Sequence, residues 1–465
     1  MIALPLALVT LAVAGLAPRL ASGLLPRERA LAAAAAALFA ATALLSPEVP
    51  VNDQWTHFVH LRAALADPIR LLDPWDRPGF TLVYAAPAAL GIAVARLTSA
   101  AVAVLGMIAT MRAARALGFA RPWVPALLLA AQYDFFGQAS STMTELPFAA
   151  ALAIAVWGWA ERRPWIAAAG IGWCAVTRPE GVLFAALGAA ALLARHRRAG
   201  PAALAVAPLG AWALVGAIAL RDPLWWVHWN AYGGMVAPRL ELRQLADSWF
   251  YEALRRSQPA VLILLEAAGA AVAVAARGRR LRFLLAPVAV SFAVLTFTRI
   301  GLGDDWRESR YLVAIAPALA LLAAAGLEAL LSAFPRAAPP ALLAIAAAGA
   351  AREILLSWHD ALLRVPYAWP GTYVAALAIA GALWAGRRRL SPRAALGLLL
   401  IIPLACSPPG LYGKQRPESA PTQGTRTDAR ADEEDARGGR REEAARVAAG
   451  ARKPDAAAPA KRPAG

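Results

Sequence analysis

The chain has 465 residues, of which 59% are hydrophobic and 17% are charged, and its mean hydropathy is +0.51. Soluble domains contain about 45–50% apolar and about 25% charged residues, so this composition excludes an ordinary soluble protein and predicts a chain lying mostly in lipid. The net charge of +17 does not indicate nucleic-acid binding, because all the lysines fall in the C-terminal tail and the Ala-rich body uses arginine alone, as a GC-rich genome favours.

The first predicted elements precede the main body of the protein. They are an additional N-terminal span near residues 2–17 and a basic loop that runs to residue 29. The main transmembrane domain covers residues 30–411 and starts with a span at 30–45. The longest outer segment follows at 46–96, and its apolar second half at 79–95 is predicted to be a helix at the membrane interface. A crossing there would put the basic cluster at 112–121 on the outer side.

Basic clusters alternate with mixed-charge gaps along the remainder of the chain. The clusters hold 20 arginines against two acidic residues, Glu28 and Glu161, and lie at residues 19–29, 112–121, 162–163, 195–198, 277–282, 336 and 387–393. Because Lys and Arg are retained on the cytoplasmic side, the basic gaps are predicted to be cytoplasmic and the mixed gaps to face outward. The alternation predicts an all-α, polytopic transmembrane protein of about 13 or 14 helices.

Residues 165–194 lie between two basic clusters, so they must cross outward and return within 30 residues. Each arm would then reach about 22 Å, less than the roughly 30 Å of the hydrocarbon core. The turn between the arms is TRPEG, residues 177–181, where Pro179 and Gly181 supply the break. Arg178 and Glu180 are therefore expected below the outer lipid surface, where charged groups normally line a watery cavity.

The composition changes after Cys406. Residues 412–465 hold 12 basic and 9 acidic groups among Pro, Gly and Ser, without an apolar period. Such a segment cannot bury enough apolar surface to fold, so a disordered charged tail is predicted.

The candidate functional residues all lie at predicted outer ends of helices. If residues 51–68 are helical, Asp53, His57 and His60 share one face, which also suits an ordinary amphipathic surface helix. Glu145 follows STMT at the start of a span, which also suits a helix cap. Arg178 and Glu180 are equally consistent with a simple internal pair.

Two further outer segments carry candidates with ordinary explanations. Arg307, Arg310 and Tyr311 precede a span, where arginines commonly snorkel to lipid head groups. His228 lies in an aromatic stretch at 222–235 that is typical of a membrane-interface belt.

The order of these features resembles the GT-C superfamily of polyprenyl-phosphate-sugar glycosyltransferases over roughly residues 30–400. The resemblance rests on NDQWTHF, ARLTSA, STMTELPF, the segment ending in TRPEG, and ESRYLVAIAP. The stretch from STMTE to TRPEG is similar to the mannosyltransferase and lipid A aminoarabinose transferase branches. The resemblance implies a GT-C-like catalytic domain in the inner membrane. It would move a sugar from a polyprenyl-phosphate donor to a glycan, lipid or protein acceptor at its periplasmic face.

Such a reaction suggests a role for each candidate. A carboxylate must accept the proton of the attacking hydroxyl, and Asp53 is the predicted general base, giving inversion, with Glu145 as the second catalytic candidate. Arg178, Arg310 and Arg307 are predicted to hold the donor phosphate, whose charge grows as it leaves. The predicted substrate-binding or positioning residues are Glu180, His57, Tyr311 and His228. No cofactor is required and no metal ligand is assigned, although a divalent cation is left open.

Two alternatives from other classes stay open. A polysaccharide ligase or polymerase acting on undecaprenyl-linked sugars would favour a large late outer loop rich in Arg and His, and His228 lies in such a loop at 221–258. A transporter would place its binding groups near the bilayer midplane, often within paired repeats. Here no repeat is visible and the acidic residues concentrate in outer loops, which favours the enzyme.

Overall fold

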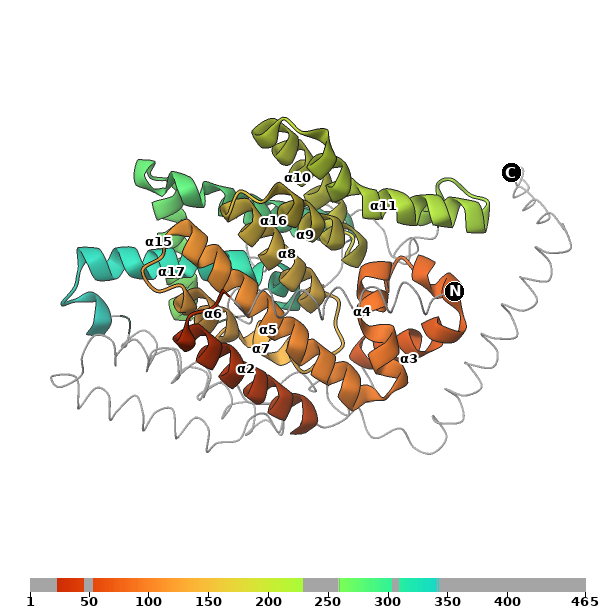
Figure 1. Cartoon of the computed structure of the whole chain (residues 1–465), viewed down its shortest axis with the longest axis horizontal. Helices are drawn as coiled ribbons and strands as arrows, with labels where there is room; N and C mark the ends of the chain where they lie inside the picture. The colour runs from red at the N-terminus through yellow and green to blue at the C-terminus, as the bar shows by residue number, and fades with distance from the viewer. Residues whose placement is uncertain are drawn as a thin grey trace, which may run out of the picture. The chain divides into compact units, whose positions relative to one another are not determined.

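The structure, a computed structural model, describes residues 23–45, 53–228, 260–302 and 309–340, together with residues 258 and 342. Every regular element in these ranges is a helix (Figure 1). The predicted span near 2–17, the tail at 412–465 and Arg307 lie outside the described residues. His228 ends a short helix, but its side chain also lies outside them.

Four of the described segments are long and apolar enough to cross a membrane. They are Pro26–Leu45 (α2), Ile92–Leu117 (α5), Ala199–Leu220 (α11) and Arg310–Ala333, which contains α17 (Ala316–Ala333). These helices confirm the predicted all-α, polytopic membrane fold. The total of about 13 or 14 helices includes residues outside the described ranges and stays a prediction. Helix α2 begins at Pro26, so the predicted basic loop ends inside its first turn.

The outer segment forms three short helices: α3 (Asp53–Ala66), the 3₁₀ helix η1 (Pro68–Leu72) and α4 (Pro78–Ala89). Helix α4 is 12 residues long, so it reaches about 18 Å and is too short to cross the bilayer. The prediction that it extends to residue 95 is wrong. Gly91 has a φ of +121°, which L-residues rarely adopt, and the chain turns there before α5 begins at Ile92.

The short arms at 165–194 form as two helices, α9 (Pro164–Thr177) and α10 (Gly181–His196), on either side of the predicted break. Their 14 and 16 residues correspond to about 21 and 24 Å. The two helices fold back closely, since a Cβ on Gly181 would lie 1.9 Å from the carbonyl oxygen of Cys174. The turn therefore places Arg178 and Glu180 at one end of both arms.

Helix α8 (Glu145–Ala160) packs against α5 on one side and α9 on another (Figure 1). Gly158 permits the contact with α9, because a Cβ there would meet the backbone nitrogen of Ala167 at 2.4 Å. The remaining described elements are α6 (Trp123–Ala130), α7 (Tyr133–Gln138), α12 (Trp225–His228), α15 (Ala260–Val274), η2 (Ala276–Leu284), α16 (Leu285–Leu302) and η3 (Ser309–Ile315).

Charged residues gather at the two ends of these packed helices. Glu145 begins α8, whereas Glu161 follows its last residue, and a 16-residue helix separates its ends by about 24 Å. Arg163 precedes α9, and Arg178 follows it. The predicted outer and cytoplasmic charges therefore lie at opposite helix ends. Which end faces the cytoplasm stays a prediction.

Candidate active site

Five of the candidate residues lie together in one network of ion pairs. Asp53 is the first residue of α3, Glu145 the first residue of α8, and Arg178 and Glu180 form the turn between α9 and α10. Arg310 lies in η3, directly before α17. Together with Thr144 and Tyr311 they are called the Arg178–Arg310 cluster here. Helix ends from four parts of the sequence thus meet at one place.

Arg178 is the most enclosed cation of the cluster, with 9% of its side chain exposed. Its Nη1 lies 2.7 Å from Oε1 of Glu145 and donates to Oγ1 of Thr144 at 2.7 Å. Its Nε donates to Oε1 of Glu180. Contacts with three side chains hold this guanidinium in place.

Arg310 joins Asp53 to the rest of the cluster. Its Nη2 donates to Oδ2 of Asp53, and its Nε lies 3.9 Å from Oε1 of Glu145. The guanidinium carbons of Arg178 and Arg310 lie 5.1 and 5.4 Å from the ring centre of Tyr311, within cation–π range. The side chain of Asp53 is 43% exposed, which makes the Asp53–Arg310 pair the accessible side of the cluster.

Glu145 is the buried carboxylate at the centre. Its Oε1 faces both guanidinium groups, and its Oε2 is buried without a hydrogen-bond partner among the described residues. Buried polar atoms are normally paired, so an oxygen in this state is a candidate for contact with a substrate group or water.

Two ordinary explanations for these residues can now be compared with the structure. STMTE does begin α8, with Thr144 before its first residue and Glu145 in its first turn, but the Thr144 side chain makes no capping hydrogen bond and its hydroxyl accepts from Arg178 instead. Arg178 and Glu180 do pair with each other, but Arg178 also binds Glu145 from another helix. The internal pair is therefore one part of a larger cluster.

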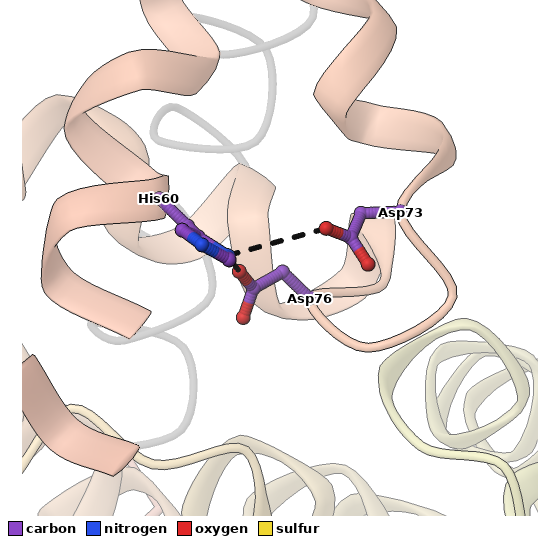
Figure 2. Close-up of side chains that lie close together, drawn as sticks. All are labelled: His60, Asp73 and Asp76. Atoms are coloured by element: carbon purple, nitrogen blue, oxygen red, sulfur yellow. Dashed lines mark hydrogen bonds and ion pairs between the residues drawn. The ribbon is translucent and has the colours of Figure 1, made fainter. Parts of the chain in front are cut away.

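His57 has its described contacts elsewhere. It is buried, its Nδ1 meets Oδ1 of Asp76, and its ring lies 4.5 Å from that of Trp75 and 5.1 Å from that of Phe80. His60, one turn further along α3, has its Nδ1 2.7 Å from Oδ2 of the same Asp76 (Figure 2). The shared face of α3 thus contacts the segment before α4.

Asp76 is ionised in this setting. Its burial would raise the pKa of the carboxyl group, but the neighbouring charges and hydrogen bonds of His57 and His60 outweigh that effect and lower the pKa below its usual value. The sequence alone did not single out Asp76. The signal that could have found it is the equal spacing of two pairs, because His57 and His60 are three residues apart and so are Asp73 and Asp76.

Arg77 is a second residue that sequence reasoning missed. Its Nη1 donates at 3.4 Å to the carbonyl oxygens of Ala175 and Arg178, and its guanidinium lies over the ring of Trp212 at 5.1 Å. It connects the segment before α4 with the turn that carries Arg178. A single arginine in a mixed-charge loop carries no pattern that indicates such a contact.

The described helices and the charged cluster at their ends define a polytopic membrane protein with a site built from arginines and carboxylates. The fold is similar to that of ArnT from Cupriavidus metallidurans. The crystal structure of apo ArnT has a TM-score of 0.59 and 15% identity, over 84% of this chain and 77% of the ArnT chain. ArnT bound to undecaprenyl phosphate has a TM-score of 0.60 and 18% identity, over 82% and 76% of the two chains.

This similarity confirms an ArnT-like membrane fold, as the sequence resemblance implied. No protein-family model matches the sequence, and no curated protein sequence matches it.

Proposed function

We propose that the protein is a membrane glycosyltransferase that moves a sugar from a polyprenyl-phosphate donor to an acceptor hydroxyl, with inversion at the anomeric carbon. The observation that carries the proposal is the accessible Asp53–Arg310 pair joined through Glu145 to the enclosed Arg178. The similarity in fold to ArnT, whose crystal structure contains undecaprenyl phosphate, supports a donor of this class.

Arg310 is the proposed primary ligand of the donor phosphate. It is less enclosed than Arg178, and its partner Asp53 is the most exposed carboxylate of the cluster. A guanidinium binds phosphate through parallel, charge-assisted hydrogen bonds, so an arriving phosphate competes with Asp53 for Arg310. As the sugar–phosphate bond breaks, negative charge grows on the phosphate, and the fixed guanidinium groups stabilise it.

Asp53 is the proposed general base. Once the phosphate has replaced it at Arg310, its carboxylate is available to accept the proton of the acceptor hydroxyl as that oxygen attacks the anomeric carbon. A single attack from the face opposite the leaving phosphate inverts the configuration. Donor binding would therefore release the base, so that Asp53 becomes available for the acceptor only when the donor is in place.

The other members of the cluster have supporting roles in this proposal. Arg178 contacts three side chains, so its positive charge stays in place when the phosphate approaches. Tyr311 offers its ring to both guanidinium groups, and these cation–π contacts help to hold them in place. The buried Oε2 of Glu145 is the best placed atom to orient an acceptor hydroxyl. We place the site on the periplasmic side of the inner membrane, because the predicted cytoplasmic arginines lie at the opposite helix ends.

The test of this function is the variant Asp53→Asn. Asn keeps the size of the side chain but does not accept a proton at neutral pH, so sugar transfer should fall by about 10²–10⁴-fold. Donor binding should stay equal or become tighter, because Arg310 loses a competing carboxylate. The matched control is Asp67→Asn at the other end of α3, where the side chain is exposed and an Asn can also accept the hydrogen bond from Ile69 N.

The assay follows transfer of labelled sugar from a polyprenyl-phosphate donor by purified protein in detergent. Transfer by Asp53→Asn within a few-fold of the wild type would remove Asp53 as the base. Glu145 would then be the first candidate to replace it.

A further inference from the structure

A second group of polar side chains lies outside the Arg178–Arg310 cluster. His60 on α3 faces Asp73 and Asp76 in the segment between η1 and α4 (Figure 2). His57, also on α3, contacts Asp76. The Nδ1 atom of His60 lies 2.7 Å from Oδ2 of Asp76 and 4.0 Å from Oδ2 of Asp73. One possible ligand atom from each of His60, Asp73 and Asp76 falls within 4.8 Å of the other two.

The orientation of these groups is fixed by their neighbours. Oδ1 of Asp73 accepts a hydrogen bond from Trp75 N at 2.8 Å, which turns Oδ2 toward His60. Oδ1 of Asp76 meets His57, which leaves Oδ2 for His60. Two carboxylates and two imidazoles therefore meet around a point that is buried on the Asp76 side and partly exposed at His60 and Asp73.

We propose that His60, Asp73 and Asp76 bind a divalent transition-metal ion with the preferences of Zn²⁺. Zinc binds imidazole nitrogen and carboxylate oxygen at about 2.0–2.2 Å, so two ligand atoms on one ion lie at most about 4 Å apart. The three side chains need to close by less than about 1 Å to meet that limit. Imidazole with carboxylates suits zinc among the common divalent ions.

The ion would place positive charge beside two carboxyl groups. Its attraction for the carboxyl oxygens of Asp73 and Asp76 would hold these two side chains together. His57 then acts as the partner that orients Asp76, because hydrogen bonds to a ligating carboxylate hold it in position for the metal. The partly exposed side at His60 and Asp73 provides the entry path, and water completes the coordination.

Such an ion would tie α3 to the segment before α4. The first residue of α3 is Asp53, and the residue after Asp76 is Arg77, which donates to the carbonyl oxygen of Arg178. The metal would therefore fix the helix that carries the proposed base relative to the turn that carries the enclosed arginine. This positioning role rests on the proposed function, whereas metal binding itself does not.

The test measures zinc in the purified, tag-free protein in detergent. The protein is stripped with EDTA, dialysed against dilute Zn²⁺ and analysed by mass spectrometry of the metal. The wild type should retain about one zinc per chain, and His60→Ala and Asp73→Asn should bind it at least about 10-fold more weakly. The matched controls are His196→Ala on α10 and Asp67→Asn, which remove the same residue types outside this group and should bind zinc as the wild type does.

A second readout separates loss of metal from loss of folding. Zinc that binds only the folded protein raises its unfolding temperature, so Zn²⁺ should shift the wild type upward, by about 2 °C or more, and leave Asp73→Asn unshifted. Asp73 is partly exposed, so this conservative change is suited to keep the fold. No zinc above background in the wild type, or equal zinc in Asp73→Asn and Asp67→Asn, would overturn the proposal. Neither readout needs sugar transfer, so the proposed function stands or falls separately.

Discussion

The two ends of the α5–α8–α9 packing both carry arginine–carboxylate pairs, but the pairs are built differently. At one end Arg115 pairs with Glu28 and Arg163 pairs with Glu161 at 2.9 Å, and 58% of the Arg163 side chain is exposed. At the other end the enclosed Arg178 is held by Glu145, Glu180 and Thr144. The first end is rich in arginine with few acids, as expected for a cytoplasmic surface.

The difference shows which charges serve the fold and which serve a site. Exposed ion pairs contribute about 0–1 kcal/mol, so the Arg163–Glu161 pair adds little to stability, whereas Glu28 in the neighbouring pair is buried. A buried cluster costs desolvation energy and gains little over apolar packing. The arrangement around Arg178 is therefore poorly explained by stability alone, which agrees with the catalytic role proposed for this end.

The largest difference between the two ends is expected for removal of their arginines. Arg178→Ala leaves Glu180 without its guanidinium partner and Glu145 with only the more distant Arg310, and it should lower the free energy of unfolding by about 3–5 kcal/mol. Arg163→Ala removes only the exposed pair and should lower it by at most about 1 kcal/mol. Denaturant titration of both variants in detergent measures the contrast. Equal losses would show that burial does not distinguish the two ends.

A smaller effect is expected at the turn that carries Arg178. The Cβ added by Gly181→Ala would lie 1.9 Å from the carbonyl oxygen of Cys174, so the turn must open and the stability should fall by about 1–3 kcal/mol. Gly210→Ala is the control, because its Cβ meets nothing within 4 Å inside α11, where Ala is the better helix former. Thermal unfolding of the two variants compares them, and an unchanged Gly181→Ala would mean that the turn is looser than described.

Much of the fold could be predicted from the sequence. The break between α9 and α10 follows from two basic clusters too close together for two full spans, and Pro179 with Gly181 marks its position. The end of α4 could not be placed in the same way, since an apolar run continues through Gly91 and only the backbone angle there stops the helix. Local composition indicates helices well but gives their ends poorly.

The candidate site was also predictable only in part. Their charge and their position at predicted helix ends identified five candidates that meet in the structure: Asp53, Glu145, Arg178, Glu180 and Arg310. Their roles remain predictions. The particular partners could not be deduced, because Asp53 and Arg310 lie 257 residues apart and only tertiary packing joins them. Thr144 was already explained locally as a helix cap, so its contact with Arg178 was not expected. Nothing next to Asp76 in the sequence indicated a role for it, and only its contacts with His57 and His60 of α3 single it out.

The central claim is that Arg310 binds the donor phosphate in place of Asp53, and binding of undecaprenyl phosphate tests it most directly. Arg310→Gln loses a charge-assisted contact of about 1.5–3 kcal/mol, so its dissociation constant should rise by about 10–100-fold. Arg115→Gln, which removes an arginine paired at the opposite helix ends, should bind as the wild type does. Equal affinity of the two variants for undecaprenyl phosphate would contradict the account.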